Sequence, residues 1–221
     1  MHSKAIFHPI DLENWPRKPY FEYYHNNLKS KYTVSIKIDI TTLFHKYKDS
    51  NYKFFPIFLY VIIRAINNSE SFRTVIYNGQ LGQWSFMQPS FTIFHKDDCS
   101  FSDLWSEYHE DFQEFYNIII QDINTYKDKK GIKIRENQPA NLIPISCVPW
   151  INFESISQDT IQDSNFLQPI IRFGKYYTEG NKVKISLSIY VNHAIADGYH
   201  TSMFLQDIQN LCDNVENWMT P

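Results

Sequence analysis

The segment 182–193, KVKISLSIYVNH, constrains the fold more than any other part of the chain. Apolar and polar side chains alternate along it, which is the pattern of a β-strand with one buried face. His193 shares the parity of the apolar residues, so we expect its ring to follow them on the buried face. Asp197 and Gly198 then indicate a turn, and apolar positions at helical spacing predict a final helix over 199–217. The chain therefore places an ionisable ring where a buried strand ends and a helix begins.

Strand and helix patterns are interspersed along the rest of the chain. Residues 33–40 alternate strictly and predict a half-buried strand. The apolar run 55–68 predicts a buried helix, and residues 103–126 have the spacing of an amphipathic surface helix. A short helix or turn is expected at 42–49, and strands at 72–77, 91–96, 142–148, 150–154, 168–177 and 183–192, with the turn-forming pair Asn78-Gly79 between the first two. We expect a mixed β-sheet flanked by helices, of the α/β or α+β class, in a single domain over 1–221.

The composition argues against several classes of protein. Of the 221 residues 43% are hydrophobic, and the formal net charge is −3, which does not suggest a nucleic-acid partner. Neither GxGxxG nor GxxxxGKS/T occurs, so neither common nucleotide-binding loop is expected. The longest apolar run, Phe54–Ile63, is shorter than the roughly 20 residues that span a bilayer. The N-terminus lacks the apolar core of a signal peptide, so we expect a cytoplasmic protein with no membrane partner.

The three cysteines, Cys99, Cys147 and Cys212, are widely spaced and odd in number. This distribution fits neither a disulfide framework nor a CxxC metal site. We therefore expect reduced and mostly buried thiols.

The position of His193 allows more than one role. An imidazole in apolar surroundings tends to be neutral near pH 7, because burial disfavours the cation, and a neutral imidazole is what a general base requires. The same position is also typical of a hydrogen-bonded core histidine. His193, Asp197 and His200 could instead supply metal ligands, although their spacing crosses a strand end, a turn and a helix start. Asp197 could serve only the turn, or could hold the loop through an ion pair with a distant cation.

Several segments together resemble the chloramphenicol acetyltransferase family. Asn192-His193-Ala-Ile-Ala-Asp197-Gly198 is similar to the HHxxxDG signature of that family, and its HxxxDG part is shared with dihydrolipoyl, carnitine and peptide-synthetase acyltransferases. The other similar segments are ENWPRKPYFEYY (13–24), SIKIDITTL (35–43), ISCVPWINF (145–153) and GKYYTEGNKV (174–183). They match the W-x-R-K block, the first strand, the Ser-x-x-Pro-Trp segment and the Gly-Lys-Tyr hairpin. These blocks follow the order of the family across nearly the full chain.

The resemblance implies a homotrimer with active sites at subunit interfaces. It implies direct transfer of acetyl from acetyl-coenzyme A to the 3-hydroxyl of chloramphenicol, which confers antibiotic resistance and requires no metal. His193 would be the general base, and Ser146 would donate a hydrogen bond to the oxyanion of the tetrahedral intermediate. Arg17 and Asp197 would form a buried ion pair that supports the loop.

The resemblance also nominates binding residues. Those implied for the acceptor are Tyr23, Tyr24 and Phe101, and those implied for the phosphate and adenine of coenzyme A are Lys53, Lys175 and Tyr176.

Four positions depart from the family pattern. Asn192 replaces the first histidine, Ala196 a common cysteine, and Ser30 a common pocket cysteine. Arg172 stands at an acceptor-site position where threonine is common, and where threonine helps to hold a water at the intermediate. An arginine there could weaken that contribution, fill part of the pocket or attract a different acceptor. An acetyltransferase for another hydroxylated small molecule and a non-catalytic trimeric ligand-binding protein are therefore alternative functions.

Overall fold

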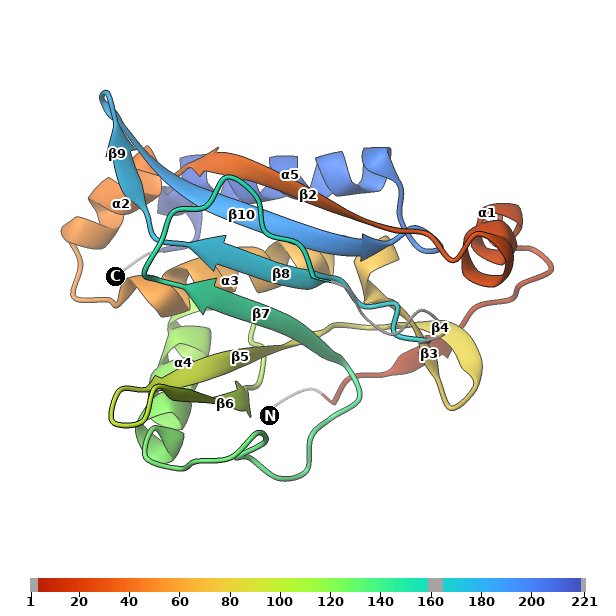
Figure 1. The fold of residues 1–221 in the computed structure, drawn as a ribbon, viewed down its shortest axis with the longest axis horizontal. Coiled ribbons are helices and arrows are strands. Elements are labelled where there is room, and N and C mark those ends of the chain that lie inside the picture. Colours follow the sequence, from red (N-terminus) through yellow and green to blue (C-terminus); the bar gives the residue numbers. More distant parts are fainter. Residues whose placement is uncertain (1–3, 159–164, 220–221) are drawn as a thin grey trace.

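A computed structural model of the protein describes residues 4–158 and 165–219, and its main feature is one mixed β-sheet (Figure 1). The strands follow the order β2-β10-β8-β7-β5-β6. Their bounds are β2 Lys31–Asp39, β10 Lys182–Asn192, β8 Ile170–Gly174, β7 Leu142–Val148, β5 Gln88–His95 and β6 Ser100–Trp105. β7 runs parallel to β5 and β8, while the other neighbours in this order are antiparallel. The predicted mixed sheet of the α/β class is confirmed.

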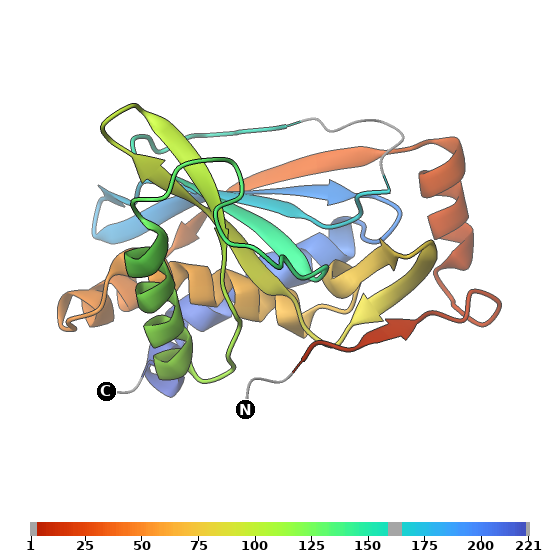
Figure 2. The same ribbon diagram turned by 90° about the horizontal axis from the view of Figure 1, so that it is seen from below.

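The longer helices cover one face of the sheet (Figure 2). They are α2 Thr41–Lys48, α3 Phe54–Asn68, α4 Phe112–Tyr126 and α5 Gly198–Asp213. The apolar parity of β10 faces them, and its members from Val183 to Val191 are each at most 8% exposed. α3 is the centre of the core, because ten of its 15 residues are buried. No helix in the described ranges is long and apolar enough to cross a membrane.

The opposite face of β10 is also covered, although its side chains are polar. Ser186 and Ser188 are each 2% exposed. The hydroxyl of Ser188 donates a hydrogen bond of 2.8 Å to the carbonyl oxygen of Ile156, so the segment after β7 passes over this face. The alternating pattern of β10 therefore separates an apolar layer from a covered polar layer, in which Ser188 is hydrogen-bonded and the Ser186 hydroxyl has no partner among the described residues.

A second, three-stranded sheet lies beside the first one. Its order is β1 (Phe7–Pro9), β4 (Gln80–Trp84) and β3 (Thr74–Tyr77). The predicted turn at Asn78-Gly79 forms, with positive φ angles of 50° and 78°, which suit these two residue types. This turn was expected to lie between the strands at 72–77 and 91–96. It instead connects β3 to the short β4, a strand that was not predicted, and β4 pairs with β3.

Two of the expected elements are wrong. Residues 103–105 belong to β6, paired with β5, and the helix expected over 103–126 begins only at Phe112. Asp111 sets that start, because its carboxylate accepts a hydrogen bond of 3.0 Å from the backbone N–H of Glu114. The strand expected at 150–154 does not form; Pro149 has no N–H with which to continue the ladder of β7.

Smaller differences affect element ends. The strand expected at 168–177 divides into β8 and the short β9 (Tyr177–Glu179), which pairs with the start of β10. The final helix ends at Asp213 and is followed by a 3-10 turn at Val215–Asn217.

Candidate active site

His193 lies directly after β10, in the turn that leads to α5. Its backbone N–H donates to the carbonyl oxygen of Ser30 at 3.0 Å. Its ring stacks on Tyr24, with centroids 3.7 Å apart and an interplanar angle of 10°. Tyr32 meets the ring edge-on at 5.2 Å. Aromatic packing therefore fixes the plane of the imidazole.

The two ring nitrogens of His193 have different surroundings. Nδ1 is buried and has no hydrogen-bond partner in the described part of the chain. Nε2 is not among the buried atoms that lack a partner, and no described residue forms a hydrogen bond with it. Nε2 is therefore the nitrogen that remains accessible, and a general base needs such an atom.

The helical segment that carries Tyr24 has an unusual backbone. The short helix α1 (Lys18–Glu22) continues into a π-helical turn, η1 (Tyr23–Asn27), a form that often occurs at functional sites. Tyr24 turns inward to His193, whereas Tyr20 and Tyr23 are 58% and 51% exposed. The histidine end of the sheet thus presents exposed aromatic rings to the solvent.

One guanidinium holds the loop after His193. Arg17 donates from Nη1 to Oδ2 of Asp197 at 3.0 Å, from Nη2 to the carbonyl oxygen of His193 at 3.1 Å, and from Nε to that of Ala194 at 3.2 Å. The side chain of Arg17 is only 13% exposed, so these contacts are shielded from competing water. Arg17, although 176 positions away from His193, is therefore a structural part of the histidine loop.

Asp197 serves the loop and the helix at once. Its Oδ1 accepts hydrogen bonds from Nδ1 of His200 at 2.8 Å and from the backbone N–H of Tyr199 at 3.0 Å, which caps α5. Burial raises the pKa of Asp197, but the hydrogen bonds from Arg17 and His200 outweigh it and hold that pKa well below its usual range. The imidazole of His193 forms no hydrogen bond with Asp197 or His200 in the described structure, so the three side chains considered as metal ligands do not converge. Among the described residues, no group of three or more His, Cys, Asp or Glu side chains could hold a metal ion.

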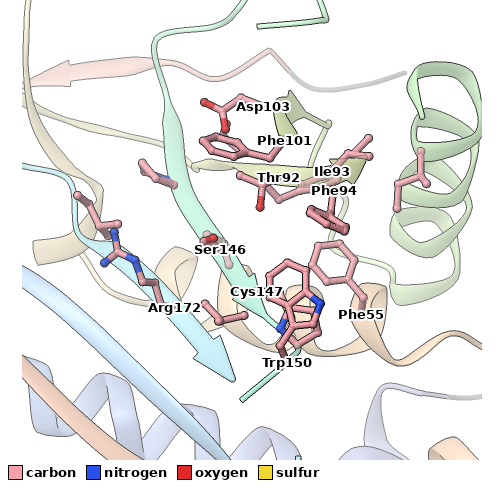
Figure 3. A pocket seen from close by; sticks show the side chains of 18 of the residues that line it. Phe55, Thr92, Ile93, Phe94, Phe101, Asp103, Ser146, Cys147, Trp150 and Arg172 are labelled. Carbon is pink, nitrogen blue, oxygen red and sulfur yellow. The ribbon is translucent and has the colours of Figure 1, made fainter. Parts of the chain in front are cut away.

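Ser146 lies elsewhere, on β7, in a cavity of about 970 Å³ (Figure 3). Phe101 and Arg172 line the same cavity, together with Cys147 and Trp150. Its rim is aromatic, because the ring of Trp150 packs edge-on against another lining residue, Phe94, at 4.8 Å. A cavity of this size with a few polar groups is suited to a small organic molecule.

The two groups of residues are far apart within one chain. Ser146 pairs with Arg172 on β8, and Arg172 pairs with Ser188 on β10. His193 comes five positions after Ser188, which is about 17 Å along the strand, while Ser146 is about 10 Å to the side. His193 does not line the Ser146 cavity. A single chain therefore does not bring the two residues together.

The three residues expected near coenzyme A gather at the start of α3. The ring of Tyr176 packs against Phe54 at 5.0 Å, and Lys53, which precedes Phe54, is exposed. Lys175 is also exposed, and its backbone N–H donates to the carbonyl oxygen of Ile151 at 2.7 Å.

The chain crosses closely at Gly174, immediately before this corner. A Cβ atom there would lie 2.8 Å from the carbonyl oxygen of Ile151, which explains the glycine of the Gly-Lys-Tyr segment. Phe55, the residue after Phe54, lines the Ser146 cavity. This corner and the cavity are therefore neighbours.

The cysteine beside Ser146 is not a reactive thiolate. Burial raises the pKa of the Cys147 thiol to about 12, so it stays protonated at neutral pH. Cys99 is exposed and also lines the cavity, and Cys212 is buried in the core. All three are free thiols, as the spacing predicts, but the expectation that they are mostly buried is wrong, since only Cys212 is buried.

Several residues of these two regions were not found from the sequence. Tyr32 contacts the His193 ring and bonds to the hydroxyl of Thr201 at 2.6 Å, and Thr92 and Phe94 line the Ser146 cavity. The alternation of 91–96 carried a signal for the last two, because Thr92 and Phe94 have the parity opposite to the core residues. Nothing in the sequence alone indicates the contact of Tyr32.

Comparisons with known proteins identify the family. A model of the family "Chloramphenicol acetyltransferase" matches residues 5–209. A chloramphenicol acetyltransferase of Clostridium perfringens is 40% identical over 96% of this chain and 98% of its own length. One of Staphylococcus aureus is 39% identical over 96% and 99%.

Solved structures show the same fold. One of a chloramphenicol acetyltransferase covers 94% of this chain and 100% of its own, with a TM-score of 0.87 at 23% identity. A dihydrolipoamide acetyltransferase of Azotobacter vinelandii covers 91% and 88%, with a TM-score of 0.67 at 13% identity. With its family model, its relatives and its fold in agreement over nearly the whole length, the chain belongs to the chloramphenicol acetyltransferase family.

Proposed function

We propose that the protein is an O-acetyltransferase that moves acetyl from acetyl-coenzyme A to the 3-hydroxyl of chloramphenicol and so confers resistance. The observation that carries this proposal is the accessible Nε2 of His193, on a braced loop, in a chain that belongs to this family. Nε2 takes the proton of the hydroxyl as its oxygen attacks the thioester carbonyl. This general-base step is typically worth about 10²–10⁴ in rate.

The second group of residues stabilises the charge that this attack creates. The thioester carbonyl becomes an oxyanion, and the hydroxyl of Ser146 donates a hydrogen bond to it. One such donor is typically worth about 10²–10³ in rate. The intermediate then collapses, coenzyme A leaves as its thiol with the proton from His193, and the acetyl ester remains. No acyl-enzyme is needed, in keeping with the raised pKa of Cys147.

The active site forms between copies of the chain. Because one chain holds His193 and Ser146 far apart, His193 of one copy faces the Ser146 cavity of the next in a homotrimer. Two exposed apolar patches support this arrangement. One is formed by Tyr20, Tyr23 and Leu28 beside His193, and the other by Phe94, Phe101 and Trp150 at the cavity rim. A head-to-tail ring buries two different patches of this kind against each other.

The remaining residues bind the two substrates. Lys53 and Lys175 are exposed cations suited to the phosphates of coenzyme A, and Tyr176 beside them offers a ring to its adenine. Tyr23 and Tyr24 approach the acceptor from the histidine side, and Phe101 and Arg172 from the cavity side. The proposed reaction uses acetyl-coenzyme A, a cytoplasmic metabolite, so we expect the protein in the cytoplasm.

A thiol-release assay with acetyl-coenzyme A, with and without chloramphenicol, tests the reaction. Chloramphenicol should stimulate release, and mass spectrometry should identify the acetylated product. No stimulation from a folded, trimeric protein would contradict chloramphenicol as the acceptor. A panel of alcohols would then identify another hydroxylated acceptor, a function that the charge of Arg172 in the cavity favours.

If His193→Ala left turnover unchanged, the role of this residue would be wrong. If chloramphenicol bound without any turnover, the protein would be a non-catalytic ligand-binding trimer.

A further inference from the structure

Arg172 is a half-buried cation that has no counter-charge among residues 4–158 and 165–219. It lies on β8 and lines the cavity of Ser146. Its guanidinium forms no hydrogen bond or ion pair with any residue in the described ranges, and burial alone lowers its pKa. The other part-buried arginines differ because each has a described partner. Arg17 and Arg135 bind a carboxylate, at 3.0 and 2.6 Å, while Arg73 donates to the carbonyl oxygen of Trp84 and Arg64 to the hydroxyl of Tyr60.

The sheet places Arg172 in a row of polar side chains (Figure 3). Ser146 pairs with Arg172, and Thr92 pairs with Asp103 on β6. Thr92 stands beside Ser146, one step beyond the last registered pair of β5 and β7. With strands about 4.8 Å apart, the Cα atom of Arg172 is one spacing from that of Ser146 and about 14 Å from that of Asp103.

The two ends of this row carry opposite charges. Arg172 and Asp103 are the two charged residues among the described residues that line the cavity. Burial raises the pKa of Asp103, and the charge of Lys133 opposes that shift. The charge is therefore positive on the Ser146 side of the cavity and negative on the β6 side. A small molecule with one charged group would bind in one orientation.

A cation held away from water is costly in free energy unless an anion pairs with it. An entering carboxylate or phosphate would gain a charge-assisted and often bidentate contact with the guanidinium. A neutral amide of the same shape would gain much less. The cavity has room for such a molecule, since its volume is about 970 Å³.

We propose that Arg172 binds an anionic group, a carboxylate or a phosphate, on a hydroxylated acceptor. The acceptor hydroxyl then reacts about one strand spacing away, where Ser146 meets the thioester carbonyl. This inference rests on the proposed acetyl transfer at the Ser146 cavity and adds a class of acceptor, anionic alcohols. Neutral chloramphenicol uses the same cavity without this contact.

A matched pair of acceptors tests the inference. Para-hydroxymethylbenzoate and para-hydroxymethylbenzamide differ only in charge at one end. Isothermal titration calorimetry without acetyl-coenzyme A measures binding, and the thiol-release assay measures turnover. The wild type should bind the benzoate about tenfold or more tightly than the benzamide. Arg172→Gln should remove this preference and leave benzamide binding nearly unchanged. Arg172→Lys, which keeps the charge without the planar fork, should retain part of it.

The controls separate charge, assembly and chemistry. Lys96→Gln removes an exposed cation outside the cavity and should keep the preference. Equal binding of both acceptors by the wild type would overturn the inference. A preference for the benzoate that survives in Arg172→Gln would also overturn it. If the oligomer dissociated in this variant as well, Arg172 would pair with an acidic group of another copy. Arg172-dependent binding of the benzoate without thiol release would support the anion position and contradict the proposed acetyl transfer.

Discussion

The histidine end of the sheet and the Ser146 cavity differ in how completely one chain determines them. At the histidine end, stacking on Tyr24, three hydrogen bonds from Arg17 and the cap at Asp197 fix the loop. In the cavity, Arg172 has no counter-charge among the described residues, and Phe101 and Trp150 are 56% and 60% exposed. The first region is rigid by itself, whereas the second offers unsatisfied groups to a substrate and to another copy. Preorganisation is concentrated where the proposed proton transfer would take place.

Loss of the base should have the largest effect. His193→Ala removes the ring on Tyr24 and the accessible nitrogen, so we expect thiol release to fall about 10²–10⁴-fold. Circular dichroism should show an intact fold, because Arg17 binds the backbone carbonyl at this position. His8→Ala, at an exposed strand position, is the matched control and should retain full activity. Equal loss in both variants would contradict the assigned role.

Loss of the hydroxyl in the cavity should have the next largest effect. Ser146→Ala should lower kcat about 10²–10³-fold and change KM for chloramphenicol little, because the hydrogen bond forms with the oxyanion. Steady-state kinetics at saturating acetyl-coenzyme A separates the two constants. A rise in KM with unchanged kcat would instead assign Ser146 to acceptor binding.

Mixing these two variants tests the separation of the two regions directly. If His193 and Ser146 act across copies, a trimer assembled from both variants contains some sites with both residues intact. Random assembly should restore roughly a quarter of wild-type sites. The measurement is thiol release by differently tagged, co-expressed and co-purified chains. A mixture as inactive as either parent would show that both residues act from the same chain.

The smallest expected effect concerns the pH dependence of the loop. The pKa of Asp197 is lowered in the folded state, so its contribution is complete above its unfolded pKa of about 3.9 and is lost as the pH falls below that value. Asp197→Asn should lower the free energy of unfolding by about 1 kcal/mol at pH 7, and the difference from the wild type should shrink toward pH 3. Urea unfolding at the two pH values measures this change. A constant difference would show that Asp197 contributes as a helix cap and not through its charge.

The sequence predicted the elements whose pattern is local. The strand 142–148 has the expected bounds, and α3 starts one residue earlier than expected. The helix expected over 103–126 was wrong in its first third. Leu104 fits both a helical and an alternating pattern, and only pairing with β5 selects the strand.

The candidate site was predictable in a similar, partial way. The motifs indicated His193, Ser146 and the pair of Arg17 with Asp197. The stack of Tyr24 on His193 depends on a π-helical turn, for which the sequence contains no spacing signal. The distance from His193 to Ser146 depends on strand order, which local patterns do not encode. That Arg172 has no counter-charge among the described residues likewise became visible only when its neighbours were in place.

Asp197 has a consequence for how the protein acquires its activity. The carboxylate of Asp197 caps the first turn of α5 and also accepts a hydrogen bond from the guanidinium of Arg17. The start of the helix and the positioning of the His193 loop therefore depend on the same side chain. During synthesis Arg17 is made 180 residues before Asp197. Its guanidinium therefore has no carboxylate of this loop to bind until Asp197 has been added. A chain released before α5 would carry Arg17, Tyr24 and Tyr32 but could not yet form the contacts that hold the His193 loop.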